Sequence, residues 1–403
     1  MKDTDLFQMA LGLIPPWLVE RYRFDAKQQR LDIYLDFSRG GEFTCYGCGR
    51  AGCKAYDTVD KTWRHLNFFE HVTYIHARVP RTDCPDCGIG LVSVPWAREG
   101  SGFTLLFEAF IMVLARDMPV KAMARLVKEH DTRLWRILDH YVDQARRGQD
   151  YSAVTRIGVD ETSSKKGHNY ISLFVDMDES KVLFATPGKG AETLEDFRKD
   201  FEAHGGRPEG IRDASCDMSP AFISGIEKNF ENAKITFDKF HVVKILNAAV
   251  DEVRRQEQKD RPELKKTRWV WLKNEENQSD KEYEIYESLK HMNWKTIRAT
   301  HLKINFQELY SQPKEAAGEF LKKWYFWATH CRIQPMVKAA KTIKRHWDGV
   351  LRWFESQLTN GLLEGLNSLI QAAKARARGY RSTRNFITMV YIIAGKLDFR
   401  LPT

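Results

Sequence analysis

The sequence predicts a multidomain α+β protein. A β-rich module is expected at the N-terminus, followed by a short helical segment and a mixed-sheet domain that an all-helical insertion interrupts. Three observations predict this organisation. Two Cys-x-x-Cys pairs lie among alternating apolar and polar residues in the first 100 positions, a pattern typical of strands. The apolar period becomes helical at residue 101 and returns to that of strands at Tyr151. A long, highly charged helical stretch then precedes a C-terminal helix.

Composition and charge limit the class of protein. The 403 residues are enough for two or three domains with cores of their own. Lys and Arg number 63 against 54 Asp and Glu, and the resulting charge of +9 favours polyanions as partners. No apolar run approaches the roughly 18 residues of a membrane helix, and nothing at the N-terminus is typical of a secretion signal. We therefore expect a cytoplasmic protein that does not bind membranes.

The first predicted domain, residues 1–100, carries four cysteines spaced as zinc ligands. Each Cys-x-x-Cys pair offers two thiolates from one tight turn, and two such turns complete a tetrahedral site. In a reducing compartment such pairs indicate metal binding rather than disulfides. The predicted ligands of a closed, structural Zn²⁺ site are Cys45, Cys48, Cys84 and Cys87. Cys53 could replace one of them. Redox pairs or unrelated core thiols are the alternative, which leaves the glycine after each pair unexplained.

Residues 101–150 are predicted to form a helix-turn-helix DNA-binding domain. Pro119 opens a short helix and Asp131 a longer one, the order of that motif. The apolar residues expected to face inward before them are Phe103, Leu106, Phe110 and Val113. The cations expected to contact DNA are Lys121, Arg125, Arg133 and Arg136. A helical linker whose arginines are merely solvated is the alternative.

Residues 151–241 are predicted to form the first part of the mixed-sheet core. Three strand patterns come first, and their tight connections indicate an antiparallel meander. A helix, a strand, a second helix and a last strand follow. This order is the ribonuclease-H-like arrangement, a mixed sheet with helices on its faces. Asp160 lies on the first strand and Asp217 ends the fourth. These strands are neighbours in that arrangement, so the two carboxylates should lie side by side.

The remainder of the chain is predicted to be helical. Residues 242–346 form the insertion, whose tryptophans are expected in its core, with stacking on unpaired bases as the alternative. Residues 347–403 return to the ribonuclease-H-like core. Glu364 lies early in a helix that Thr359 or Asn360 can cap, next to apolar positions that face the sheet. The cations that follow without an intervening acid, and are expected to contact the DNA backbone, are Lys374, Arg376, Arg378, Arg381 and Arg384.

Three carboxylates brought together from these segments predict a metal-dependent active site. Asp160, Asp217 and Glu364 can hold two divalent ions against a phosphodiester, one for the attacking and one for the leaving oxygen. Mg²⁺ is the expected ion because it prefers oxygen ligands. Asp238 and His241, at the end of the last predicted strand, could orient a carboxylate or the substrate. Alternatively, Asp238 caps the next helix. The sequence therefore indicates a nuclease or a transposase.

These segments resemble the ISL-three family of bacterial insertion-sequence transposases, within the wider class of DDE transposases. The resemblance covers nearly the whole chain. It includes the double Cys-x-x-Cys module, the helix-turn-helix, and the strings VDETSSKKGHNY, SCDMSPAFI, FDKFHVVK and TNGLLEGLNSLIQ. It implies that Asp160, Asp217 and Glu364 are the DDE triad and that the N-terminal modules recognise terminal inverted repeats.

The resemblance also implies what the protein does with DNA. The element's ends would be cleaved by hydrolysis, and the freed 3′-hydroxyls joined to target DNA. Double-stranded DNA, both inverted repeats and target, is then the partner. Holding both ends together requires a homodimer or a larger synapse, associated with the nucleoid when DNA is bound.

Two other functions use the same modules. A zinc and helix-turn-helix regulator with an inactive core would bind DNA without cutting it, and three intact acids argue against this reading. A structure-selective nuclease would cut without joining. It would use the same metal site, so the chemistry of the residues does not separate it from a transposase.

Overall fold

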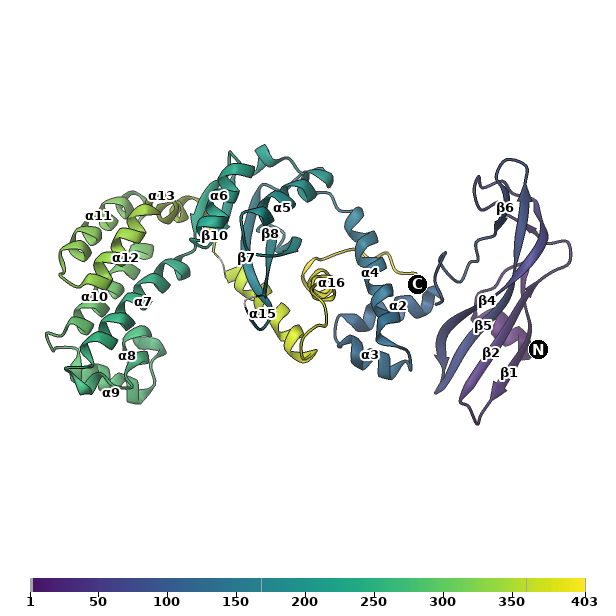
Figure 1. Ribbon diagram of the computed structural model, residues 1–403, viewed down its shortest axis with the longest axis horizontal. Helices are drawn as coiled ribbons and strands as arrows, with labels where there is room; N and C mark the ends of the chain where they lie inside the picture. The colour runs from purple at the N-terminus through teal and green to yellow at the C-terminus, as the bar shows by residue number, and fades with distance from the viewer. Residues whose placement is uncertain (1–2, 168, 360, 403) are drawn as a thin grey trace. The chain divides into compact units, whose positions relative to one another are not determined.

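The computed structural model describes residues 3–167, 169–359 and 361–402. The chain divides into two compact units (Figure 1). The first comprises the chain up to Arg146 together with the short segments Ala375–Arg378 and Leu397–Thr403, and the second comprises the rest. Within the described residues, no helix combines the length and the apolar character needed to span a membrane.

A six-stranded sheet dominates the first unit. Its order is β1-β2-β5-β4-β3, with β6 added at β5. The first two strands and the pair β4–β5 are antiparallel hairpins, whereas β2 and β5 run parallel. Trp17, Ile33 and Trp63 lie in the core that this sheet covers. The elements are α1 (Asp3–Ala10), β1 (Trp17–Asp25), β2 (Arg30–Phe37), β3 (Glu42–Phe43), β4 (Cys53–Phe68), β5 (His71–Cys84) and β6 (Gly88–Leu91).

Three helices follow the sheet and belong largely to the same unit. They are α2 (Leu105–Ala115), α3 (Val120–Leu126) and α4 (Asp131–Arg147). A four-residue turn separates α3 from α4, as in a helix-turn-helix. Arg64 of β4 is fully buried and donates a hydrogen bond at 2.9 Å to the carbonyl of Val127 in that turn. The zinc module and the helix-turn-helix therefore share a buried polar contact.

The buried face of α2 differs from the predicted one. Leu106, Phe110 and Val113 are exposed. The apolar residues that α2 buries are Phe107, Ile111, Met112 and Ala115. The sequence LLFEAFIMVLA is apolar around most of the helix, so periodicity alone does not choose a face.

A buried carboxylate on α2 is held by residues outside the helix. Glu108 is fully buried and accepts hydrogen bonds from Arg98 Nε at 2.9 Å, Ser101 Oγ at 2.6 Å and the Tyr141 hydroxyl at 3.1 Å. Burial and the Glu108 charge raise the pKa of Tyr141, so the phenol remains a hydrogen-bond donor. This network fixes the orientation of α2 that the apolar pattern leaves open.

Removing the cation of this network should destabilise the first unit. We expect Arg98→Ala to lower the free energy of unfolding by about 3 kcal/mol, because it leaves the buried Glu108 charge unpaired. Urea denaturation of the full chain, followed by circular dichroism, measures the change. The matched control is Arg78→Ala, which removes the exposed partner of Asp36 and should cost less than about 1 kcal/mol. Equal losses in both variants would contradict the role given to Arg98.

The second unit is built on a five-stranded mixed sheet in the order β11-β10-β7-β8-β9. The strands β7, β8 and β9 form an antiparallel meander, and β10 and β11 run parallel to β7. The chain order is that of a ribonuclease-H-like core, which confirms the predicted fold class. The elements are β7 (Arg156–Lys165), β8 (Asn169–Asp176), β9 (Lys181–Pro187), α5 (Glu192–Ala203), β10 (Asp213–Cys216), α6 (Pro220–Asn229) and β11 (Lys234–Phe237).

Helices cover both faces of this sheet (Figure 1). On one face, Ile157 and Val159 of β7 pack in one core with apolar residues of α5 and α6. On the other face, Gly158 contacts α15 (Gly361–Arg376), and α16 (Thr383–Ala394) lies against β9. Alternate residues of β7 therefore pack against helices on opposite faces of the sheet.

The helical insertion follows β11 directly, and its core is continuous with that of the sheet. Trp271 and Trp324 are fully buried, as predicted, whereas Trp269 and Trp327 are about half exposed. Its helices are α7 (Lys239–Glu257), α8 (Arg268–Leu272), α9 (Asp280–Leu289), α10 (Lys295–Gln307), α11 (Lys314–His330) and α12 (Gln334–Arg345). The next two helices, α13 (Trp347–Leu351) and α14 (Trp353–Ser356), lie beyond residue 346 and contact β11.

Candidate active site and zinc site

The parallel register brings Asp160 and Asp217 to one level of the sheet. Strand β10 pairs with β7 so that Ser215 lies opposite Gly158. If this register continues for two more residues, Asp217, which directly follows β10, comes level with Asp160. Asp160 faces α15, because it accepts a hydrogen bond from Asn367 of that helix, and the alternation of side chains along strands would place Asp217 on the same face. The charge of Asp217 also raises the pKa of Asp160.

The surroundings of Asp160 suit a bound cation. Burial is the main cause that raises the pKa of Asp160 to about 6, although the Glu161 N–H and the charge of His241 act in the opposite direction. A partly buried carboxylate beside a second one carries negative charge that its surroundings do not fully balance. Divalent ions such as Mg²⁺ bind to one or two carboxylates of this kind together with phosphate and water. The residues therefore fit such an ion.

Helix α15 approaches β7 closely because position 158 is a glycine. A Cβ at Gly158 would lie 2.5 Å from Met177 Sδ and 3.0 Å from a methyl carbon of Leu363. Any larger residue would push the helix away from the strand. Gly158 thus sets the distance between α15 and the strand that carries Asp160.

Amide side chains continue this contact along β7. Asn367 Nδ2 donates to Asp160 Oδ2 at 2.5 Å, and one turn later Gln371 Nε2 donates to Thr162 Oγ1 at 2.7 Å. Four helical residues rise about 6 Å and two strand residues about 6.6 Å, so helix and strand remain in step. Nothing in the sequence marks Asn367 as a site residue except its spacing, three positions after Glu364.

Glu364 lies in the first turn of α15, next to Leu363. Its side chain is exposed, at the end of the helix that contacts the part of β7 around Gly158 and Asp160. Within the described residues, the three acids do not form a group whose ligand atoms all lie within 4.8 Å of one another. Of the two residues expected to cap the helix, Asn360 lies outside the described residues.

Asp238 caps α7, as the alternative interpretation of the sequence predicts. It is almost fully buried and accepts a hydrogen bond from the N–H of Phe240 at 2.7 Å. His241, in the first turn of α7, places Nδ1 3.9 Å from Asp238 Oδ1. That nitrogen is buried and has no hydrogen-bond partner among the described residues. The charge of His241 also lowers the pKa of Asp160.

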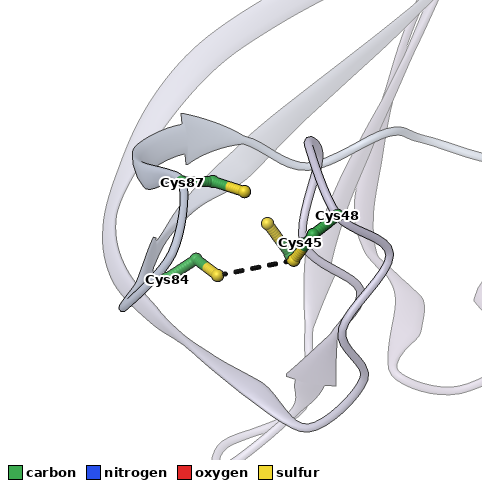
Figure 2. A group of neighbouring side chains, drawn as sticks. All are labelled: Cys45, Cys48, Cys84 and Cys87. Atoms are coloured by element: carbon green, nitrogen blue, oxygen red, sulfur yellow. Dashed lines mark hydrogen bonds between the residues drawn. The ribbon is translucent and has the colours of Figure 1, made fainter.

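The four predicted zinc ligands converge in the first unit. Figure 2 shows Cys45, Cys48, Cys84 and Cys87, whose sulfur atoms all lie within 4.8 Å of one another. With Zn–S bonds of about 2.3 Å, a tetrahedral zinc ion sets sulfur atoms about 3.8 Å apart. The Sγ atoms of Cys48 and Cys84 are 3.6 Å apart. The chemistry and spacing of this group fit a closed zinc site.

Glycines and backbone amides shape the two cysteine turns. Gly49 and Gly88, which follow the two pairs, have φ of +75° and +74°, a conformation that favours glycine. The N–H groups of Cys48 and Gly47 lower the pKa of Cys45 to about 6, which favours the thiolate that metal binding requires. Cys53 lies beside this group, where its Sγ donates to the carbonyl of Arg50 at 3.5 Å.

The cations predicted to contact DNA in the helix-turn-helix differ in their surroundings. Lys121 and Arg125 of α3 and Arg136 of α4 are exposed. Arg133 instead forms an ion pair at 2.6 Å with Glu129, whose side chain is buried. Three of the four cations are therefore available to a partner, and the fourth is engaged within its own unit.

The C-terminal cations also divide into two kinds. Lys374 Nζ donates to the carbonyl of Ser163 at 2.6 Å and so helps to attach α15 to β7. The remaining cations are exposed, namely Arg376, Arg378, Arg381 and Arg384.

A ribonuclease-H-like sheet with an acid on one strand and a second acid directly after the neighbouring strand, in a chain with a zinc site and a helix-turn-helix, defines a DDE transposase. Three family models match the chain. A DDE model of the ISL3 family described as "Transposase" matches residues 157–390. The "Helix-turn-helix domain of transposase family ISL3" matches residues 92–142, and the "zinc-finger of transposase IS204/IS1001/IS1096/IS1165" matches residues 41–87. The chain belongs to the ISL3 family of transposases, and its helix-turn-helix makes DNA its partner.

Full-length relatives agree with this assignment. The transposase for insertion sequence element IS1557 of Mycobacterium tuberculosis (strain ATCC 25618 / H37Rv) is 28% identical, and the match covers 97% of this chain and 96% of the relative. The transposase for IS1001 of Bordetella parapertussis is 27% identical, with 97% and 98% covered. The HTLV-2 integrase catalytic core domain in complex with magnesium matches 38% of this chain and 99% of that domain, at 16% identity. Its TM-score of 0.17 is too low to establish a common fold.

Proposed function

We propose that this transposase binds the terminal inverted repeats of its insertion sequence, cleaves DNA at the element ends and joins the freed 3′-hydroxyls to target DNA. The observation that carries the proposal is the parallel register of β7 and β10, which runs to Gly158 and Ser215, two residues before Asp160 and Asp217. The first turn of α15 carries the third acid, Glu364.

Asp160, Asp217 and Glu364 are the proposed ligands of two Mg²⁺ ions. Such a pair would supply charge stabilisation at the attacking and leaving oxygens of the phosphodiester. Asp160, on the strand next to the one that Asp217 follows, and Glu364, on the helix over that strand, would hold the ions together with Asp217. Asp238 holds the start of α7, and its proposed role is to keep His241 beside the acids.

Exposed cations are proposed to bind the DNA backbone and set its path. Those of α3, α4 and the segment after α15 neutralise phosphates, which contributes affinity that falls steeply with salt. Both element ends must be held during cleavage and joining. We therefore propose a homodimer or larger assembly on DNA, associated with the nucleoid.

Two arginines of α4 should separate DNA binding from stability. Arg136→Ala is expected to reduce the slope of log K against log salt by about 1, because one phosphate contact is lost. Arg133 pairs with Glu129 and lies over the ring of Phe103 at 4.3 Å, so Arg133→Ala should lower the melting temperature and leave the slope unchanged. Fluorescence titrations with DNA from the element ends, at several salt concentrations, measure the slope. A reduced slope in Arg133→Ala together with an unchanged slope in Arg136→Ala would contradict the roles proposed for these two arginines.

The proposed function is tested with labelled DNA from the flanks of the protein's own gene. The full chain is incubated with this DNA in Mg²⁺ and, separately, in EDTA. We expect cleavage at a defined position and joined products in Mg²⁺, and binding without cleavage in EDTA. Binding without cleavage under both conditions would favour the regulator. Release of 3′-hydroxyl ends that never join would favour the structure-selective nuclease.

A further inference from the structure

We propose that Asn367 is a positioning residue for Asp160, one that holds this carboxylate in the orientation needed to bind a divalent cation. The inference rests on the proposed function, because it takes Asp160 as a metal ligand. It adds a residue outside the three acids, on the helix that carries Glu364.

Both oxygens of Asp160 are held by hydrogen-bond donors. The Glu161 N–H donates to Oδ1 at 2.8 Å, and Asn367 Nδ2 donates to Oδ2 at 2.5 Å. A carboxylate has about four acceptor positions, so two donors fix its plane and leave lone pairs for a cation. Donors of this kind orient metal ligands in many sites, and their loss weakens metal binding.

The chemistry of an asparagine suits this position. Its amide donates to Asp160 without adding a charge, whereas a lysine would neutralise the carboxylate and compete with a cation. An aspartate would repel it. Asn367 Oδ1 is buried and has no hydrogen-bond partner among the described residues. This free acceptor lies beside an acid, where a hydrated divalent ion would bring water molecules that can donate to it.

Gln371 provides the matched comparison within the same helix. It also carries an amide, lies one turn further along α15, and donates to Thr162 Oγ1 at 2.7 Å and to the carbonyl of Ser163 at 2.9 Å. Both residues therefore attach α15 to β7, but only the Asn367 bond ends on a carboxylate. An effect of anchoring the helix should appear in variants of both residues, whereas an effect on the metal site should appear only at Asn367.

The test uses Mn²⁺ as the probe and needs no DNA. The zinc-loaded full chain is titrated with Mn²⁺, and free Mn²⁺ is measured by electron paramagnetic resonance. We compare wild type with Asn367→Leu, Gln371→Leu and Asp160→Ala, after thermal melting shows that each is folded. Asn367→Leu, which keeps the volume but removes the donor, should weaken Mn²⁺ binding about tenfold. Gln371→Leu should remain within about twofold of wild type, and Asn367→Ala repeats the test with a smaller side chain.

Each outcome decides the inference. Wild-type affinity in both Asn367 variants would overturn it, and so would an equal loss in the Asn367 and Gln371 variants, which would make Asn367 a helix anchor only. If Asp160→Ala binds Mn²⁺ as tightly as wild type does, the proposed metal site itself is wrong. That result is distinct from a failure at Asn367 alone, in which Asp160→Ala abolishes binding and the Asn367 variants do not weaken it.

Discussion

Replacing Asp160, Asp217 or Glu364 by alanine is expected to reduce cleavage at the element ends by about a thousandfold or more, in each case separately. The estimate follows from the cost of removing one fixed electrostatic contact to a transition state, which is about a hundred- to thousandfold. Loss of a metal ligand removes more than one such contact. DNA binding should persist, because none of the three acids supplies positive charge to the backbone.

Gel assays with labelled end DNA in Mg²⁺ measure both properties, cleavage by product length and binding by retardation. The matched control is Glu161→Gln, which changes the residue next to Asp160 on β7. Successive strand residues project to opposite faces, so cleavage by this variant should stay within a few-fold of wild type. Appreciable Mg²⁺-dependent cutting by any alanine variant would remove that residue from the proposed triad.

Replacing Cys84 by serine should cause a larger loss of folded structure than replacing any of the three acids by alanine. We expect Cys84→Ser to lose zinc and to unfold the β-rich module. Zinc binding contributes about 10–16 kcal/mol in small zinc domains, which is comparable to the entire stability of a typical domain, about 5–15 kcal/mol. Because β5 and β6 meet at this turn, unfolding would reach the sheet and should abolish specific DNA binding.

Zinc content, circular dichroism and end binding are measured together. Cys53→Ser is the control, because Cys53 lies beside the four sulfur atoms and its Sγ donates to a carbonyl of the same turn. That variant should retain one zinc ion per chain. One zinc ion per chain in purified Cys84→Ser, or none in wild type, would contradict the zinc assignment.

The sheet of the second unit could be predicted because strand order and alternation follow from local patterns. The change of period at Tyr151 and the tight connections gave the meander. The topology of a ribonuclease-H-like core then made β7 and β10 neighbours, as the structure shows. The four cysteines could be predicted as ligands of one zinc site because each Cys-x-x-Cys pair occupies a single turn. Whether the two turns lie next to each other could not be predicted from the spacing alone.

Other features depend on contacts that no local pattern records. The apolar pattern of α2 fits several faces, and the choice depends on Glu108 and its donors, among them Arg98 and Tyr141. Arg133 lies on the helix predicted to contact DNA, but it pairs with Glu129 of the preceding turn, whose side chain is buried. Asn367 contacts Asp160 across 207 positions of the chain. Such a pairing becomes visible only when helix and strand are placed in register.

The most direct test is the structure of the full chain bound to element-end DNA and Ca²⁺. Ca²⁺ binds to the same kind of oxygen ligands as Mg²⁺ but is a larger ion, and it replaces Mg²⁺ here so that the DNA remains uncut. We predict that carboxylate oxygens of Asp160, Asp217 and Glu364 all lie about 2.3–2.6 Å from the bound ions, with Glu364 turned from solvent towards the two aspartates. Ions held by Asp160 and Asp217 while the Glu364 carboxylate still faces solvent would contradict the three-acid site.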